Sequence, residues 1–158
     1  MAGKTVQNSI VVMNELVLPN DTNVLGNILG GRVMHYMDIC AAMSAYKHAR
    51  SPVVTASVDR LNFLAPAKVG DILILKSSVN YTGNTSMEVG VRIESENTIS
   101  GEINHTASAY LTFVSLDDER KPKQVERINP ETADEVRRFK QAEMRKEIRK
   151  ARLKDIVK

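Results

Sequence analysis

The sequence predicts an α+β domain, in which an antiparallel sheet packs over one long helix and a second helix follows at the C-terminus. Residues 30–48 form the only long helical pattern in the first three-quarters of the chain. Strand-like segments joined by short turns then occupy residues 53–116, without the strand–helix alternation of a parallel sheet. A sheet covered by one helix leaves an edge strand unpaired, so we expect dimers.

Charge is divided unequally along the chain of 158 residues. Residues 1–118 carry 8 basic and 11 acidic side chains, and residues 119–158 carry 14 basic and 8 acidic ones. We expect residues 1–116 to form the folded domain and residues 117–158 to form a charged linker and a basic helix. Acids are interspersed in this basic segment and Phe139 is its only aromatic residue. We therefore expect a solvated, salt-bridged helix, with neither nucleic acid nor membrane as a partner.

Cysteine and histidine usage argues against disulfides and metal sites. The single cysteine, Cys40, excludes an internal disulfide framework and is expected to pack as a small apolar residue. The three histidines show no ligand spacing with acids or cysteine, so we expect neither a metal nor another cofactor. No segment approaches the roughly 18 consecutive apolar residues of a membrane span. We expect a cytoplasmic protein.

The segment before the long helix combines a strand and a glycine-containing loop. Residues 7–18 are rich in apolar and β-branched side chains and predict a strand. Gly26 and Asn27 favour a turn in the loop that follows. Gly30 and Gly31 then begin the helix, where unpaired N–H groups and the positive end of the helix dipole can bind a ligand oxygen. A tight turn without a ligand is equally compatible with these two glycines.

The helix over residues 30–48 carries one acid at the edge of its apolar stripe. None of the neighbours of Asp38 one turn away could pair with a carboxylate. Because burial of an unpaired carboxylate costs several kcal/mol, we infer a functional role for Asp38. The alternative is that Asp38 leans out to water. Placing residues at about 100° per step gives the expected members of the apolar stripe, Met34, Met37, Ala41, Ser44 and Ala45.

The strands after the helix follow from residue alternation and turn residues. Pro52 ends the helix. We expect strands over residues 53–63, 71–82, 86–96 and 102–116, with Gly83-Asn84 as a two-residue hairpin turn. The faces expected to point inward on the last two strands hold Met87, Val89, Val91 and Ile93, and Ala107, Ala109, Leu111 and Phe113.

The C-terminal helix is expected to lie on a surface or on a partner. Asn129 is a suitable N-cap and Pro130 suits the first turn, so the helix is predicted from there to about Ile156. It has few apolar residues for its length, which is typical of a surface helix. These residues are Val136, Phe139, Met144, Ile148 and Leu153.

Several motifs occur in a characteristic order. Residues 23–31 (NVLGNILGG) precede Met37-Asp38, and residues 54–59 (VTASVD) lead to Asn62-Phe63. Pro66 with Val69-Gly70-Asp71, and then Ser86-Met87-Glu88-Val89, follow. Between residues 8 and 116 the chain thus resembles the hotdog-fold acyl-CoA thioesterases, specifically the bacterial short-chain and mammalian cytosolic acyl-CoA hydrolase group. The basic C-terminal helix lies outside this resemblance.

The resemblance implies a fold, an assembly and an activity. The fold is an antiparallel sheet wrapped around one long helix, in homodimers with a continuous sheet that often assemble into hexamers. The activity is hydrolysis of acyl-CoA to a fatty acid and CoA. The catalytic acid falls on Asp38 and the loop asparagine on Asn27, and the two meet across the dimer interface. The backbone N–H groups of Gly30 and Gly31 would form the oxyanion site.

Other assignments stay open at this point. Asp38 can act as a general base or as a nucleophile. Arg60, Ser86 and Arg92 are candidate contacts for CoA, with Lys68 a further candidate for its phosphates. Each of these basic residues is also compatible with a simple solvated charge.

Two other functions compete with hydrolysis. The first is a non-catalytic acyl-CoA-binding regulatory domain whose basic tail contacts DNA. The second, a hotdog dehydratase or hydratase, would need a histidine paired with an aspartate, and no histidine here lies in a matching motif.

Overall fold

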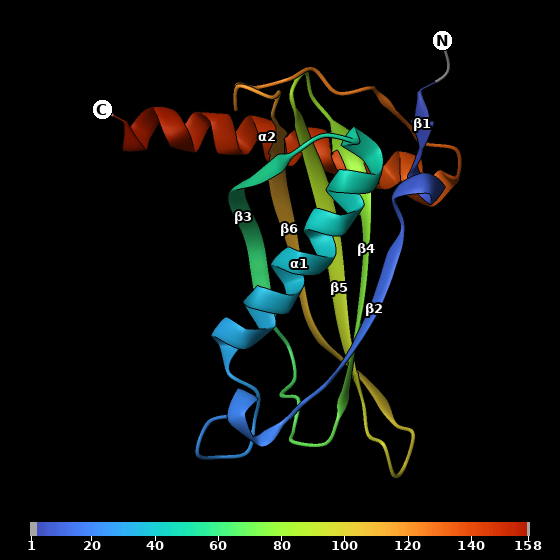
Figure 1. The fold of residues 1–158 in the computed structure, drawn as a ribbon, viewed down its shortest axis with the longest axis vertical. Coiled ribbons are helices and arrows are strands. Elements are labelled where there is room, and N and C mark those ends of the chain that lie inside the picture. The colour runs from blue at the N-terminus through green and yellow to red at the C-terminus, as the bar shows by residue number, and fades with distance from the viewer. Residues whose placement is uncertain (1–2, 158) are drawn as a thin grey trace.

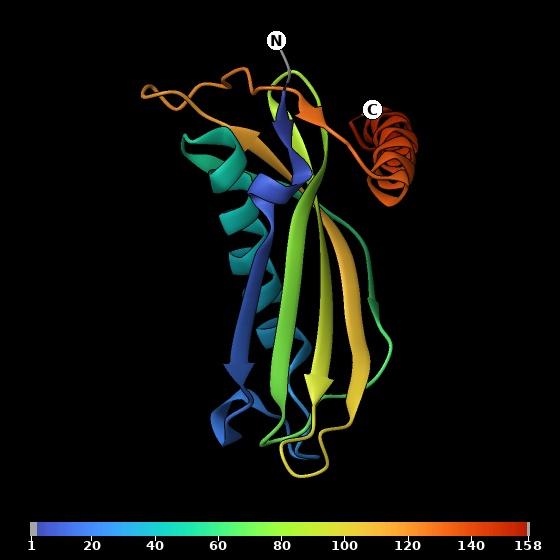
Figure 2. The ribbon, with the colours of Figure 1, turned by 90° about the vertical axis from the view of Figure 1, so that its right-hand side faces the viewer.

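A five-stranded antiparallel sheet lies between two helices in the computed structural model, which describes residues 3–157 (Figures 1 and 2). The strand order is β2-β4-β5-β6-β3. The sheet strands are β2 (Val11–Leu16), β3 (Val53–Phe63), β4 (Ile72–Thr82), β5 (Ser86–Glu96) and β6 (Ile103–Ser115). The helices are α1 (Gly30–Ala49) and α2 (Ala133–Ile156). Four short elements complete the fold, namely β1 (Lys4–Thr5), η1 (Val6–Ser9), η2 (Pro19–Asp21) and β7 (Ile128–Asn129).

The core lies between α1 and the inner face of the sheet. The inward residues predicted for β5 and β6 are confirmed, because all eight are buried at 3% exposure or less. Cys40 is also fully buried and free, as expected, and burial raises the pKa of its thiol. The thiol donates a hydrogen bond to Ser77 Oγ on β4 at 3.3 Å. Cys40 is therefore a packing residue that ties the helix to the sheet.

Two sequence-based boundaries differ from the structure. The strand predicted over residues 7–18 is limited to Val11–Leu16, because Val6–Ser9 form a 3₁₀ turn closed by a hydrogen bond from Ser9 Oγ to the Val6 carbonyl. The predicted apolar stripe of α1 is also wrong at Met34, which is 43% exposed. The other four predicted residues, Met37, Ala41, Ser44 and Ala45, are confirmed as buried, and Val33, Cys40 and His48 complete the buried face.

Thr132, rather than Asn129, is the N-cap of α2. Its side chain accepts a hydrogen bond from the Glu135 backbone N–H, and the Glu135 carboxylate accepts one from the Thr132 N–H, which forms a capping box. Pro130 therefore precedes the helix. Asn129 instead belongs to β7, which pairs in parallel with β1.

The segment predicted as a charged linker also contributes to the core. Val125 and Ile128 are buried in it. The boundary proposed between residues 116 and 117 stays a prediction.

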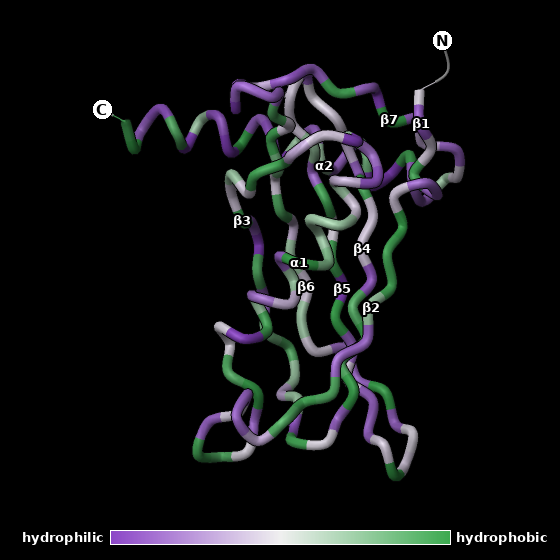
Figure 3. Tube along the Cα trace, viewed as in Figure 1, coloured by the Kyte–Doolittle hydropathy of each residue, from purple (hydrophilic) through white to green (hydrophobic). Residues whose placement is uncertain are grey.

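Helix α2 crosses the outer face of the sheet, opposite α1 (Figure 2). Most of it is hydrophilic (Figure 3), and of its predicted apolar contacts only Phe139 packs against the core. Val136, Met144, Ile148 and Leu153 are exposed. No helix within residues 3–157 is both long and apolar enough to cross a membrane.

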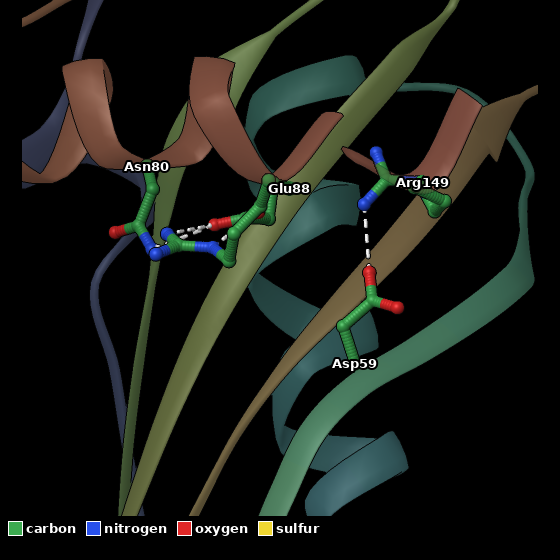
Figure 4. A network of polar contacts seen from close by, with 5 residues as sticks. Asp59, Asn80, Glu88 and Arg149 are labelled. Carbon is green, nitrogen blue, oxygen red and sulfur yellow. Dashed lines mark hydrogen bonds and ion pairs between the residues drawn. The ribbon is translucent and has the colours of Figure 1, made fainter. Parts of the chain in front are cut away.

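One buried and one partly buried ion pair attach α2 to the sheet. Arg145 donates to both carboxylate oxygens of Glu88 on β5, at 3.0 and 2.7 Å, and its guanidinium stacks 3.6 Å from the Tyr110 ring centre. Asn80 adds a 3.3 Å hydrogen bond to the Glu88 carboxylate, and Arg149 pairs with Asp59 at 2.7 Å (Figure 4). We expected α2 to be a solvated helix. Instead, polar side chains of α2 form ion pairs with side chains of the sheet in the same chain, and these pairs hold the helix in place.

His48 at the end of α1 gives a prediction for acid stability. Its ring is 1% exposed, Nε2 donates to the Glu126 carbonyl at 2.7 Å, and Nδ1 is buried without a partner. Burial lowers the pKa of His48, because a charged ring would hold an unsatisfied Nδ1–H. Below its ordinary pKa of about 6.5 the unfolded chain therefore binds a proton that the folded chain does not.

We expect the stability from His48 to be complete above about pH 6.5 and to fall as the pH drops, by at most about 1.4 kcal/mol per pH unit. Urea unfolding at pH 7.5 and 5.5 measures this change. His48→Gln, which can still donate to the Glu126 carbonyl, should make the pH dependence shallower. An equal pH dependence in both proteins would assign the acid sensitivity to other groups.

Candidate functional site

Asp38 lies half-buried in the middle of α1, at the side of the sheet formed by edge strand β3. Thr55 Oγ1 on β3 donates a hydrogen bond to Asp38 Oδ1 at 2.7 Å. This bond fixes one carboxylate oxygen and leaves the other available to a ligand or water. Asp38 is therefore partly exposed and also held by the protein, and its catalytic role stays a prediction. Sequence reasoning missed Thr55, because a threonine in a strand pattern gives no sign of its contact with Asp38.

The N-terminal end of α1 lacks a side-chain cap. Leu29 occupies the N-cap position and makes no side-chain cap hydrogen bond. The Leu29 carbonyl accepts hydrogen bonds from the N–H groups of Arg32 and Val33. These two bonds form the first turn of α1, which contains Gly30 and Gly31. The two glycines therefore present their backbone at the positive end of the helix dipole. Their role as oxyanion donors stays a prediction.

An apolar cavity of about 360 Å³ adjoins this helix end. Gly30 forms part of its wall, and a Cβ atom at this glycine would lie 3.5 Å from the Phe63 ring. The other lining residues include Ile28, Val33, Leu64, Pro66 and Thr106. This is the kind of concave, mainly apolar site that takes small organic ligands.

Asn23 organises the loop before α1. Its side-chain Oδ1 accepts hydrogen bonds from the N–H groups of Leu25 and Asn27, at 2.9 and 3.2 Å. The Asn23 N–H also donates to the Asn27 carbonyl at 2.9 Å, and Asn27 forms a bridge with Lys68. The backbone of Asn27, the predicted loop asparagine, is thus held by Asn23, which sequence reasoning did not single out.

The candidate CoA contacts are not brought into one site. Arg92 is exposed on β5 near Glu94 and lines a basic cleft of about 490 Å³ with Lys76, Arg137 and Arg138. Ser86 is six residues away on the same strand, which corresponds to about 20 Å.

Arg60 lies in a separate crevice at the edge of the sheet. It lines this crevice with Asp59 and with Arg149 and Arg152 of α2. Consecutive strand residues normally point to opposite faces, but a register shift after Asp59 and the positive φ of 51° at Arg60 mark a bulge here. The bulge turns Arg60 to the face that carries α2.

Exposed apolar side chains surround the Asp38 edge. On α1 this residue is Met34, and on β3 and its continuation they are Val54, Val58, Phe63 and Leu64. Because β3 is an edge strand of this sheet, the surface combines apolar area with unpaired backbone groups. Within residues 3–157, no cluster of three or more His, Cys, Asp or Glu side chains is arranged to hold a metal ion.

Comparison with known proteins assigns the chain to a family. The sequence profile of the thioesterase superfamily matches residues 25–102. The uncharacterized acyl-CoA thioester hydrolase YkhA of Bacillus subtilis is 40% identical over 146 residues, which are 92% of this chain and 85% of that protein. The chain belongs to the thioesterase superfamily. The sheet wrapped around α1 is the predicted hotdog fold.

Solved structures of thioesterases agree with this assignment along nearly the whole chain. An apo-hexameric acyl-CoA thioesterase superimposes with a TM-score of 0.93 at 46% identity, covering 97% of this chain and 98% of that one. An acyl-CoA hydrolase from Staphylococcus aureus, in complex with butyryl coenzyme A, coenzyme A and coenzyme A disulfide, gives 0.90 at 43% identity, covering 96% and 93%. Variants of the staphylococcal enzyme with an aspartate, a threonine or an asparagine replaced by alanine also match.

Proposed function

We propose that this protein hydrolyses acyl-CoA thioesters to a carboxylic acid and CoA. The observation that carries the proposal is the half-buried Asp38 carboxylate, oriented by Thr55 beside an edge strand. Asp38 takes a proton from water, the water oxygen bonds to the thioester carbonyl carbon, and the C–S bond breaks as CoA leaves. The N–H groups of Gly30 and Gly31 stabilise the developing oxyanion. The names of the superfamily members above support the same reaction.

Release of free thiol from acyl-CoA esters of increasing chain length tests the activity directly. We expect turnover of at least part of the panel. Binding of CoA without turnover of any ester would instead favour the non-catalytic acyl-CoA-binding domain. A single turnover in ¹⁸O-labelled water tests the role of Asp38, because an anhydride that water opens at the Asp38 side-chain carbon places the label in the protein, whereas a general base places it only in the released acid.

Asn23 is the stronger candidate for the catalytic asparagine. In the staphylococcal hydrolase, the intervals between the substituted asparagine, aspartate and threonine equal those between Asn23, Asp38 and Thr55. Because the Asn23 oxygen already accepts two loop N–H groups, its NH₂ group is the part available to substrate or water. Asn27, the asparagine predicted from the resemblance, is retained as the competing candidate.

Replacement of each asparagine by alanine should separate them, with the larger loss of kcat at the catalytic position. Asn23→Asp is the informative second variant, since it keeps the oxygen that orders the loop and loses the NH₂ donor. If Asn27→Ala is the more damaging substitution, the assignment to Asn23 is wrong.

We propose a homodimer joined through β3 and α1, assembled further into a hexamer. The exposed apolar surface at this edge supports the dimer, and the hexameric relative supports the larger assembly. Asp38 of one protomer would then act with the loop asparagine of its partner. The cytoplasm is the proposed location, which the buried free thiol of Cys40 fits.

Mixing inactive subunits tests the shared site. Dimers formed from Asp38→Ala and Asn23→Ala subunits should recover about half of the wild-type sites, because one of the two sites then holds both intact residues. Native mass spectrometry confirms that mixed dimers have formed. Mixed dimers without activity would place the whole site within one chain.

We propose that the crevice at Arg60 binds a phosphate of CoA. Arg60, Arg149 and Arg152 surround about 60 Å³ with only Asp59 as an acid among the lining residues, and guanidinium groups suit phosphate oxygens. Arg60→Gln should raise KM for acyl-CoA about tenfold with little change in kcat. An acyl ester of 3′-dephospho-CoA tests which phosphate is bound, and equal KM values for Arg60→Gln and wild type would remove Arg60 from the site.

A further inference from the structure

The basic cleft beside Arg92 lies between α2 and the outer face of the sheet, on the other side of the sheet from α1 and Asp38 (Figure 2). Its volume of about 490 Å³ is within the range of sites for small molecules. None of the described residues that line it is acidic. Its charged lining residues are Lys76 of β4, Arg92 of β5, and Arg137 and Arg138 of α2.

Small residues form the floor of this cleft. Gly90 and Arg92 alternate with Glu88 along β5 and therefore share its face, which carries α2. Ser78 of β4 lies opposite Gly90, and Ser108 of β6 lies opposite Arg92. Because Ser78, Gly90 and Ser108 are small, they leave space between the sheet and α2.

The two cations on the sheet exceed the negative charge beside them. Lys76 and Arg92 lie directly opposite each other in the β4–β5 ladder, an arrangement that is unfavourable for like charges. Both contact one carboxylate, that of Glu94, at 2.9 and 3.9 Å. One positive charge on the sheet is therefore not neutralised.

The two cations on α2 are also poorly compensated. Arg137 pairs with Asp134 at 3.3 Å, but the Asp134 side chain is 72% exposed, and such a surface pair contributes little. Within residues 3–157, the Arg138 side chain has no ion pair or hydrogen bond. Four cations and two carboxylates therefore leave a net charge of +2 around the cleft.

The cleft is separate from the crevice at Arg60. The cleft is lined by Arg137 and Arg138 in the first half of α2, whereas the crevice is lined by Arg149 and Arg152 in the second half. Because a helix rises about 1.5 Å per residue, Arg138 and Arg149 are roughly 16 Å apart along α2. The phosphate site proposed at Arg60 therefore does not account for the charge around the cleft.

We propose that this cleft binds a small metabolite that carries two or more phosphate or carboxylate groups. Guanidinium and ammonium groups suit the oxygens of both, and a polyanion matches the excess positive charge. Ile10 and Val12, which also line the cleft, contact the carbon skeleton of the ligand. The ligand joins α2 to the sheet and thereby stabilises the native state. This binding goes beyond the proposed hydrolysis and does not depend on it.

Calorimetric titration of the full-length protein with pyrophosphate and with citrate tests the site and separates phosphate from carboxylate ligands. We expect one bound anion per chain for at least one probe, with an affinity that falls as the salt concentration rises. Arg138→Gln breaks no contact in the free protein and should raise Kd about tenfold. Lys140→Gln is the control, because it removes the same charge from an exposed position of α2 outside the cleft and should leave Kd within twofold.

The other outcomes would overturn the proposal. Absence of binding by both probes, or equal weakening by Arg138→Gln and Lys140→Gln, would reduce the cleft to a generally attractive basic surface. Loss of binding in Arg60→Gln, or in saturating CoA, would place the anion in the CoA site. A change of assembly size in Arg138→Gln, measured by light scattering, would make the cleft an interface between copies. The titration uses no thioester, so its result is independent of whether the protein hydrolyses acyl-CoA.

Discussion

Replacing Asp38 by asparagine is expected to lower kcat for acyl-CoA hydrolysis by about 10²–10⁴-fold, the usual contribution of a general base. The amide keeps the shape of the carboxylate and can still accept the hydrogen bond from Thr55 Oγ1, so far-UV circular dichroism and assembly size should not change. A free-thiol assay on butyryl-CoA measures the loss. Turnover within twofold of wild type would show that Asp38 is not the catalytic acid.

Two further variants define what the loss means. Asp118→Asn makes the same chemical change at an exposed turn and should leave kcat unchanged. Thr55→Val removes the hydrogen bond to Asp38 and should lower kcat by about ten- to a hundredfold, because hydrogen bonds to charged groups are worth about 1.5–3 kcal/mol. Thr55→Ser should restore most of the activity, and its failure to do so would indicate a packing role for the threonine methyl group.

Loss of the Glu88 charge is expected to have the largest effect on stability. Glu88→Gln leaves the Arg145 guanidinium, whose side chain is 8% exposed, without its anionic partner. An uncompensated buried charge of this kind costs about 3–5 kcal/mol, which is a large part of the total stability of a domain. Urea unfolding at a fixed protein concentration measures the change, and limited proteolysis should show earlier cleavage within α2.

A double variant distinguishes a buried charge from a lost contact. Glu88→Leu together with Arg145→Met removes both charges at similar volume and should recover most of the lost stability. Glu147→Gln, which breaks the exposed pair with Lys150 at 3.9 Å, should cost less than about 0.5 kcal/mol. If Glu88→Gln costs no more than Glu147→Gln, the Arg145–Glu88 pair does not anchor α2.

The long elements could be predicted because their periodicity and their breakers agree. Pro52 indicated where α1 ends, and Gly83-Asn84 indicated the turn between β4 and β5. The alternation of apolar and polar residues indicated which side chains of β5 point into the core. The Thr132 cap of α2 was also visible as a threonine three residues before a glutamate, but the adjacent Asn129-Pro130 pair gave a competing signal.

Other features depend on contacts that a sequence pattern does not contain. Charged side chains such as Arg145 are normally solvated. In the sequence, a face of α2 that binds the sheet through ion pairs therefore cannot be told from a face exposed to solvent. Bulges are one-residue shifts in pairing, and residue alternation alone does not reveal the shifts at Arg60 in β3 and at Thr106 in β6. Asp38 was found because it departs from an apolar pattern, whereas Thr55 fits an ordinary strand pattern.

The parallel pairing of β1 with β7 has a consequence for folding during synthesis. Lys4 and Thr5 are synthesised before their partners Ile128 and Asn129, which follow only after all five strands of the large sheet. Because chains emerge at about 5–20 residues per second, the N-terminal strand waits several seconds without its partner. The β4–β5 and β5–β6 hairpins can form within microseconds of emerging. Pairing of β1 with β7 is therefore expected to be a late event, after the sheet that packs on α1 has formed.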